Sequence, residues 1–175
     1  MKNVVVLAIL VFLSVLLVGC EEQTILISNS METYYKPIAI YNITGNVLGD
    51  VDNVSNFDDD KILVINEIVG TPGFDIRFNF TNVTNFNYVH VRYYYVGSIN
   101  HYYQLQLWNY RTWTNLESEQ GDNADLYLDK TYHIPQFNDT KYINNGNVIL
   151  RMVHPNMGVG THKVYVDYVS LEYKI

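Results

Sequence analysis

Side chains that could bind a polar ligand are concentrated between residues 88 and 110. If Leu105 and Leu107 face the core of a β-strand, its two-residue period turns the side chains between them outward. The same period turns residues 90, 92 and 94 outward on a strand that we expect to lie beside it. Rigid aromatic rings cost little entropy to order, and they stack on sugars while amide and guanidinium groups bind hydroxyls. We predict one carbohydrate-binding face formed by Trp108, Tyr110, Tyr94, Arg92, Gln104 and Gln106. The alternative is that these side chains only cover a sheet or pack beneath a loop.

A run of three aspartates at positions 58–60 could supply oxygen ligands to a calcium ion. Calcium takes several oxygen ligands at once, so a further carboxylate, Glu67 or Asp167, would have to be brought in by the fold. The run is not an EF-hand loop, because it lacks the alternating ligand spacing and the central glycine. The candidate calcium ligands are Asp58, Asp60 and Asp167, and the alternative is a solvated turn.

The five histidines include no His-x-His pair and no His-Glu-x-x-His motif, and the chain has one cysteine. This spacing predicts no zinc site, and we expect the histidines at sheet edges and in loops. Neither a Gly-x-Ser-x-Gly elbow nor a phosphate-binding P-loop occurs. We therefore expect a non-catalytic protein that requires no cofactor, with structural calcium as the one candidate ion. Trp113 is expected to fill the core at the start of a strand.

The first twenty residues are typical of a secretory signal. Lys2 precedes an apolar run over residues 4–18 that is interrupted only by Ser14. A permanent membrane helix needs about 20 apolar residues, so this shorter run fits the core of a signal peptide. Residues 17–20, Leu-Val-Gly-Cys, resemble the prokaryotic lipobox, which implies lipidation of Cys20. We expect a signal peptide over 1–19, a lipidated tether over 20–36 and one domain over 37–175. The mature protein would be secreted across the cytoplasmic membrane and held at the cell envelope by its lipid.

The composition favours an all-β domain and argues against some partners. The chain has 16 tyrosines and little alanine, and its formal net charge is −7. Aromatic and β-branched residues favour strands. An acidic chain without a basic patch cannot neutralise nucleic-acid phosphates, so no nucleic-acid partner is expected, and charge would not draw it to anionic lipid.

Short alternating segments separated by turn residues follow one another along the whole domain. The clearest strands expected are Pro37–Asn42, Lys61–Ile68, Phe74–Phe80, Tyr88–Val96, Tyr103–Tyr110, Val148–His154 and His162–Ile175. Strands of this length and spacing, without a credible helix, predict an antiparallel two-sheet β-sandwich.

Three stretches of the domain are similar to the galactose-binding-like and carbohydrate-binding-module jelly-roll sandwiches. They are Phe57–Lys61 with Glu67 and Thr71–Phe74; Val91–Tyr95 with Gly97, His101 and Trp108–Leu116; and Val148–Met152 with Gly158, His162 and Val166–Leu171. The resemblance implies a jelly-roll fold, and it raises the expectation of structural calcium. Because one fold serves many tasks, it leaves the ligand open. A glycan or surface polysaccharide is the expected partner. The alternative is a surface-layer, virion-associated or prophage-encoded lipoprotein that binds a protein, and a polysaccharide-acting enzyme is a distant third.

Overall fold

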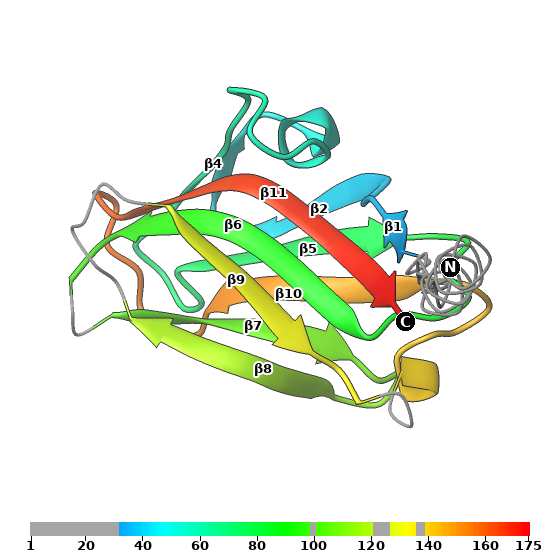
Figure 1. The fold of residues 1–175 in the computed structure, drawn as a ribbon. Coiled ribbons are helices and arrows are strands. Elements are labelled where there is room, and N and C mark those ends of the chain that lie inside the picture. Colours follow the sequence, from blue (N-terminus) through cyan, green and yellow to red (C-terminus); the bar gives the residue numbers. More distant parts are fainter. Residues whose placement is uncertain (1–31, 99–100, 121–126, 136–138) are drawn as a thin grey trace, which may run out of the picture.

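The structure, a computed structural model, describes residues 32–98, 101–120, 127–135 and 139–175. These residues form two antiparallel β-sheets packed face to face, with two short 3-10 turns, η1 (Val51–Val54) and η2 (Asp139–Lys141) (Figure 1). The predicted all-β jelly-roll sandwich is confirmed. Within the described ranges, no helix has the length and apolar character needed to cross a membrane.

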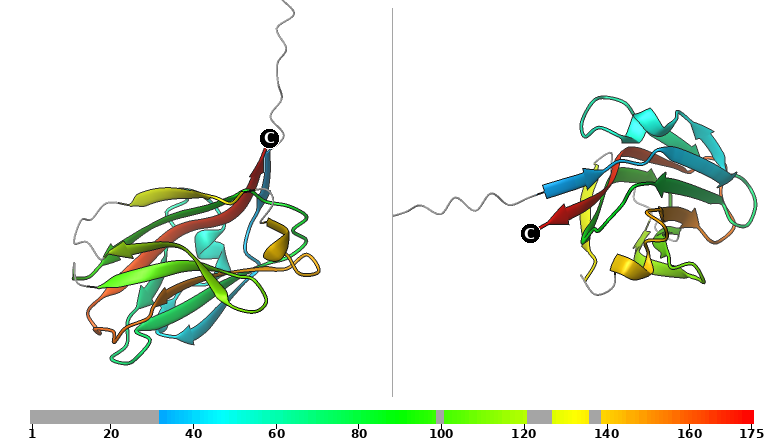
Figure 2. Two further views of the ribbon diagram at one scale, coloured as in Figure 1. Left: turned by 90° about the horizontal axis from the view of Figure 1, so that it is seen from below. Right: turned by 90° about the vertical axis from the view of Figure 1, so that its right-hand side faces the viewer.

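The first sheet contains six strands. Its order is β3 (Asn46–Leu48), β4 (Leu63–Asn66), β11 (Lys163–Lys174), β6 (Tyr88–Val96) and β9 (Leu128–His133), and β1 (Glu32–Tyr35) pairs with the end of β11. In Figure 2, β1 and the C-terminal end of β11 project together from one end of the sandwich. The last part of the segment expected to be a tether, residues 32–35, is therefore a strand of this sheet.

The second sheet contains five strands. Its order is β2 (Ala39–Thr44), β5 (Phe74–Phe80), β10 (Val148–His154), β7 (Tyr102–Trp108) and β8 (Trp113–Gln120). Strands β6 and β7 follow one another in the chain but belong to opposite sheets. The expectation that they are neighbours in one sheet is therefore wrong, because the chain crosses from one layer to the other between them.

Alternating apolar side chains build the core between the two sheets. On β5, Phe74, Ile76, Phe78 and Phe80 are fully buried, and the residues that alternate with them, Asp75, Arg77 and Asn79, point outward. Strand β11 supplies the opposite wall. A β-bulge between Val166 and Tyr168 adds one residue there, so its buried valine and leucine side chains stay on the inner face along twelve residues.

Candidate functional site

The six predicted ligand-binding residues do not lie on one face. Gln104, Gln106 and Trp108 point outward from β7 in the second sheet, whereas Arg92 and Tyr94 point outward from β6 in the first sheet. The predicted outward orientation of alternate side chains is correct on each strand. The prediction that the six residues share one face is wrong, because the body of the sandwich separates the two outer surfaces.

Two tryptophans lie side by side on the outside of the second sheet. Trp108 on β7 pairs with Trp113 on β8, and their ring centroids are 5.0 Å apart with the planes inclined at 50°. The guanidinium carbons of Arg151 and Arg77 lie 5.0 Å and 5.2 Å from the centroid of Trp113. The prediction that Trp113 fills the core is therefore wrong, since it forms a cation–π group on the outer surface. We call this surface the tryptophan face; its residues are Asp75, Arg77, Gln104, Gln106, Trp108, Trp113, Asn115 and Arg151.

A buried carboxylate fixes both arginines of the tryptophan face. Arg151 donates through Nε and Nη2 to the two oxygens of Asp75, at 2.9 Å and 2.7 Å. Arg77 donates to the same oxygens at 3.3 Å and 3.2 Å. The side chain of Asp75 is 4% exposed. Burial alone would raise the pKa of Asp75, but the hydrogen bonds from Arg151 and Arg77 outweigh it and hold that pKa below its usual range.

Amide groups extend this network across four strands. Arg151 donates through Nη1 to Gln106 Oε1 at 3.0 Å, and Gln106 Nε2 donates to Gln104 Oε1 at 2.9 Å and Asn115 Oδ1 at 2.7 Å. Asp75, Arg151, Gln106 and Asn115 thus connect β5, β10, β7 and β8 in order. Such a network holds polar donors in place before a ligand arrives, which lowers the entropic cost of binding.

The side chain of Tyr110 forms hydrogen bonds within the protein. It adopts a left-handed backbone conformation with φ of 66° just after β7. Its hydroxyl donates to the carbonyl oxygens of Tyr142 at 3.0 Å and Asn147 at 2.5 Å, and burial raises its pKa. We therefore assign its hydroxyl to fastening this turn, and not to a ligand.

The outer face of the first sheet holds a second aromatic group. Tyr94 stacks on Tyr165 with centroids 4.3 Å apart and planes inclined at 10°, and Tyr127 contacts Tyr94 edge-on. Arg92 lies 4.8 Å from the centroid of Phe57. The rings of this face therefore pack largely on one another.

The predicted calcium ligands lie on this same face. Asp58 and Asp167 meet, since the Asp58 backbone N–H donates to Asp167 Oδ2 at 3.3 Å. Arg92 contacts both carboxylates, at 2.9 Å to Asp58 and 3.4 Å to Asp167. Asp60 is exposed in a left-handed turn conformation with φ of 62°. Burial raises the pKa of Asp167. Arg92 thus supplies the cation that these two carboxylates contact, and calcium stays a prediction.

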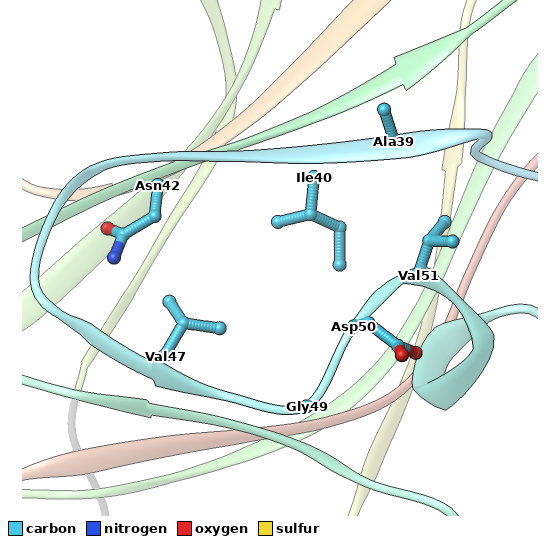
Figure 3. Close-up of a pocket in the computed structure, with 7 residues that line it drawn as sticks. All are labelled: Ala39, Ile40, Asn42, Val47, Gly49, Asp50 and Val51. Carbon is cyan, nitrogen blue, oxygen red and sulfur yellow. The ribbon is translucent and has the colours of Figure 1, made fainter.

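Two surface hollows lie away from the tryptophan face. One, of about 380 Å³, lies between β2, β3 and η1 (Figure 3). Its one charged group, Asp50, already caps η1 by accepting from the Asp52 N–H at 2.9 Å. The other, of about 260 Å³, is lined by Tyr34, Phe57, His90, Tyr168, Glu172 and Lys174. Its buried Glu172 binds His90 at 2.8 Å and Lys174 at 2.8 Å, so these polar groups are already paired.

Three histidines converge on a buried glutamate at one end of the sandwich. Glu67 follows β4, His101 precedes β7, His154 ends β10 and His162 precedes β11. We call these four residues the histidine cluster. Glu67, His101 and His154 form a group whose ligand atoms lie within 4.8 Å of one another. Their wide separation in the chain hid them from motif analysis. The expectation that all the histidines lie at sheet edges and in loops is wrong for two of them, because His154 is fully buried at the end of the interior strand β10 and His90 lies within the interior strand β6.

Cys20, the predicted lipidation site, lies outside the described residues, so the lipid anchor stays a prediction.

No protein-family model matches the chain, and no curated protein sequence is significantly similar to it. Solved structures do resemble it. A variant of a carbohydrate-binding module of family 29 has a TM-score of 0.50 at 11% identity, with 81% of this chain and 92% of that chain covered. The K2 cleaved adhesin domain of Lys-gingipain has a TM-score of 0.52 at 11% identity, with 80% and 97% covered. At such low identity these similarities establish the fold.

Proposed function

We propose that this chain is a non-catalytic module that binds carbohydrate on the tryptophan face. The observation that carries the proposal is the pairing of Trp108 and Trp113 beside the ordered network of Asp75, Arg151 and Gln106. Aromatic rings bind the apolar faces of sugars, and fixed polar groups bind their hydroxyls. The likeness in fold to a carbohydrate-binding module agrees with this proposal.

Two features distinguish the tryptophan face from the opposite surface. On the tryptophan face, Asp75 holds the Arg151 guanidinium in one orientation, and the amide groups of Gln106 and Gln104 continue the same network. On the first sheet, Tyr94 is stacked almost parallel on Tyr165, with the planes inclined at 10°, whereas the planes of Trp108 and Trp113 are inclined at 50°.

We further propose that the module is held at the cell envelope through lipidated Cys20. The apolar run before Cys20 and the polar residues after it support this assignment. Acyl chains contribute about 0.8 kcal/mol for each buried CH₂ group, and stable anchoring takes more than one chain. Mass spectrometry of the protein extracted from membranes tests it: a Cys20→Ala variant should lose the lipid mass and leave the membrane fraction.

A glycan array tests the carbohydrate proposal, and the two faces provide a matched comparison. Trp108→Ala should abolish binding, whereas Tyr94→Ala, which removes an aromatic ring from the opposite face, should leave binding unchanged. Arrays read in calcium and in EDTA test whether the acidic residues around Asp58 contribute through an ion. A blank array from well-folded protein, or binding that is lost in Tyr94→Ala and kept in Trp108→Ala, would overturn the proposal. The first of those outcomes favours the alternative, a protein partner.

A further inference from the structure

The histidine cluster joins the two sheets at one end of the sandwich. Glu67 and His162 border strands of the first sheet, while His101 and His154 border strands of the second. The side chains of Glu67 and His154 are 0% exposed. His101 and His162 are 22% and 15% exposed, so solvent reaches the cluster from one side.

The separations within the histidine cluster fit the edges of a metal coordination shell. The Nδ1 atom of His154 lies 3.1 Å from Oε1 of Glu67, and those of His162 and His101 lie 3.6 and 3.9 Å from its other oxygen, Oε2. Ligands about 2.1 Å from a tetrahedral zinc ion lie about 3.4 Å from one another. The two longer separations exceed the range of a hydrogen bond, so direct bonding to Glu67 does not explain the positions of His101 and His162.

Buried nitrogen atoms of the cluster lack partners. His154 Nδ1 contacts Glu67 at 3.1 Å, but His154 Nε2 has no hydrogen-bond partner among the described residues, and the same holds for Nδ1 of His101 and of His162. An unpaired polar group in the interior costs free energy, and native proteins pair nearly all of them. A bound ion would pair several of these nitrogens at once.

We propose that the histidine cluster is a structural site for a divalent transition-metal ion, zinc being the ion tested. Glu67, His101 and His154 are the first three ligands, because they are already gathered. His162 is the fourth, since its Nδ1 faces Glu67 and its ring centroid lies 4.7 Å from that of His101. Imidazole with carboxylate is a ligand set of zinc and related ions, whereas calcium requires oxygen ligands.

The surroundings of Glu67 support the same assignment. Tyr95 donates its hydroxyl to Oε1, and the Val159 backbone N–H donates to Oε2 at 2.7 Å. Carboxylates that bind metals are commonly oriented by such hydrogen bonds from outside the coordination shell. Gly73 provides room for the buried imidazole: a Cβ atom there would lie 2.6 Å from His154 Nδ1.

Zinc binding by the full chain tests the proposal independently of any carbohydrate. After treatment with a chelator, titration calorimetry with Zn²⁺ should give one ion per chain, and zinc should raise the midpoint of thermal unfolding. His101→Ala should weaken zinc binding by at least about 10-fold, since even residues outside a coordination shell contribute about 10–100-fold. His133→Ala is the matched control, because His133 lies on β9, packs against Tyr88 and is not part of the histidine cluster. The zinc affinity of His133→Ala should match that of the unchanged chain.

Cobalt substitution supplies a second readout that does not depend on a core variant folding. Co²⁺ bound by nitrogen and oxygen ligands in a tetrahedral site should give visible absorption bands, and these should disappear in His101→Ala while its circular dichroism remains that of a folded β-protein. Absence of saturable zinc binding to the folded chain would overturn the proposal. Equal zinc affinity in His101→Ala and His133→Ala would do the same.

Discussion

Replacing Asp75 with asparagine should destabilise the protein strongly, because this carboxylate is the buried centre of the tryptophan face. The change leaves two guanidinium groups without their counter-charge. Removing one partner of a fully buried ion pair costs about 3–5 kcal/mol. Here the side chains of Arg151 and Arg77 are 18% and 31% exposed, so water can partly replace the carboxylate. We therefore expect a loss of about 2–3 kcal/mol in the free energy of unfolding.

Urea denaturation at pH 7 measures this loss, with Asp129→Asn as the matched control. Asp129 carries the same charge, but its side chain is 52% exposed and pairs with His90. An exposed pair contributes about 0–1 kcal/mol. A loss of about 2–3 kcal/mol should lower the melting temperature by about 4–12 °C in a protein of this size. If Asp75→Asn costs no more than Asp129→Asn, the network does not act as a buried, ordered unit.

The pH dependence of the same variant checks the physical cause. The pKa of Asp75 is lowered in the folded protein, so the ion pairs contribute their full stability above the pKa of the unfolded chain, about 3.9. That contribution is lost as the pH falls through the lower folded pKa. The difference in stability between the unchanged chain and Asp75→Asn should therefore be constant from pH 7 to 5 and shrink below about pH 4. A difference that stays constant down to pH 2 would refute this cause.

Three further changes test other parts of the fold. Phe78→Ala empties a fully buried core position and should lower the unfolding free energy by about 3–5 kcal/mol, measured in urea with an unchanged denaturant slope. Gly158→Ala would place a Cβ atom 2.6 Å from the backbone Cα of Gly73, so the two segments must separate. We expect a loss of about 1–3 kcal/mol in the free energy of unfolding. An unchanged midpoint of urea denaturation would contradict that close approach. Burial alone would raise the pKa of Glu172, but the hydrogen bonds and charges of Lys174 and His90 together outweigh it and lower that pKa. Glu172→Gln should therefore reduce stability at pH 7, and progressively less as the pH falls below about 4.5; thermal unfolding measured across pH checks this.

Much of the strand content could be predicted from the sequence. The ranges Phe74–Phe80, Tyr88–Val96 and Val148–His154 coincide with β5, β6 and β10. In each range apolar side chains alternate with a period of two residues, and this local pattern can be recognised directly in the sequence. Strand β3 escaped prediction because it is three residues long, and β1 because it continues a segment without sustained alternation.

The candidate site was predicted only in part. Outward orientation was correct for Gln104 and Trp108, because it follows from the burial of their neighbours on β7. The prediction for Trp113 was wrong because a large apolar residue usually favours the core, whereas here two guanidinium groups contact its ring on the outer surface. Asp75 and Arg151 were missed because nothing in the sequence relates residues that are 76 positions apart.

The sequence by itself determined the class of the fold, which side chains of each strand face the core, and the predicted signal before Cys20. These properties depend on residue type and on a period of two within a single segment. Tertiary structure alone decided which strands share a sheet. It separated Tyr94 from Trp108, joined Asp75 to Arg151 across a ladder of backbone hydrogen bonds, and gathered the histidine cluster from four segments. The physical reason is that strand pairing between distant segments is selected by the packing of the whole core, and no local pattern records that choice.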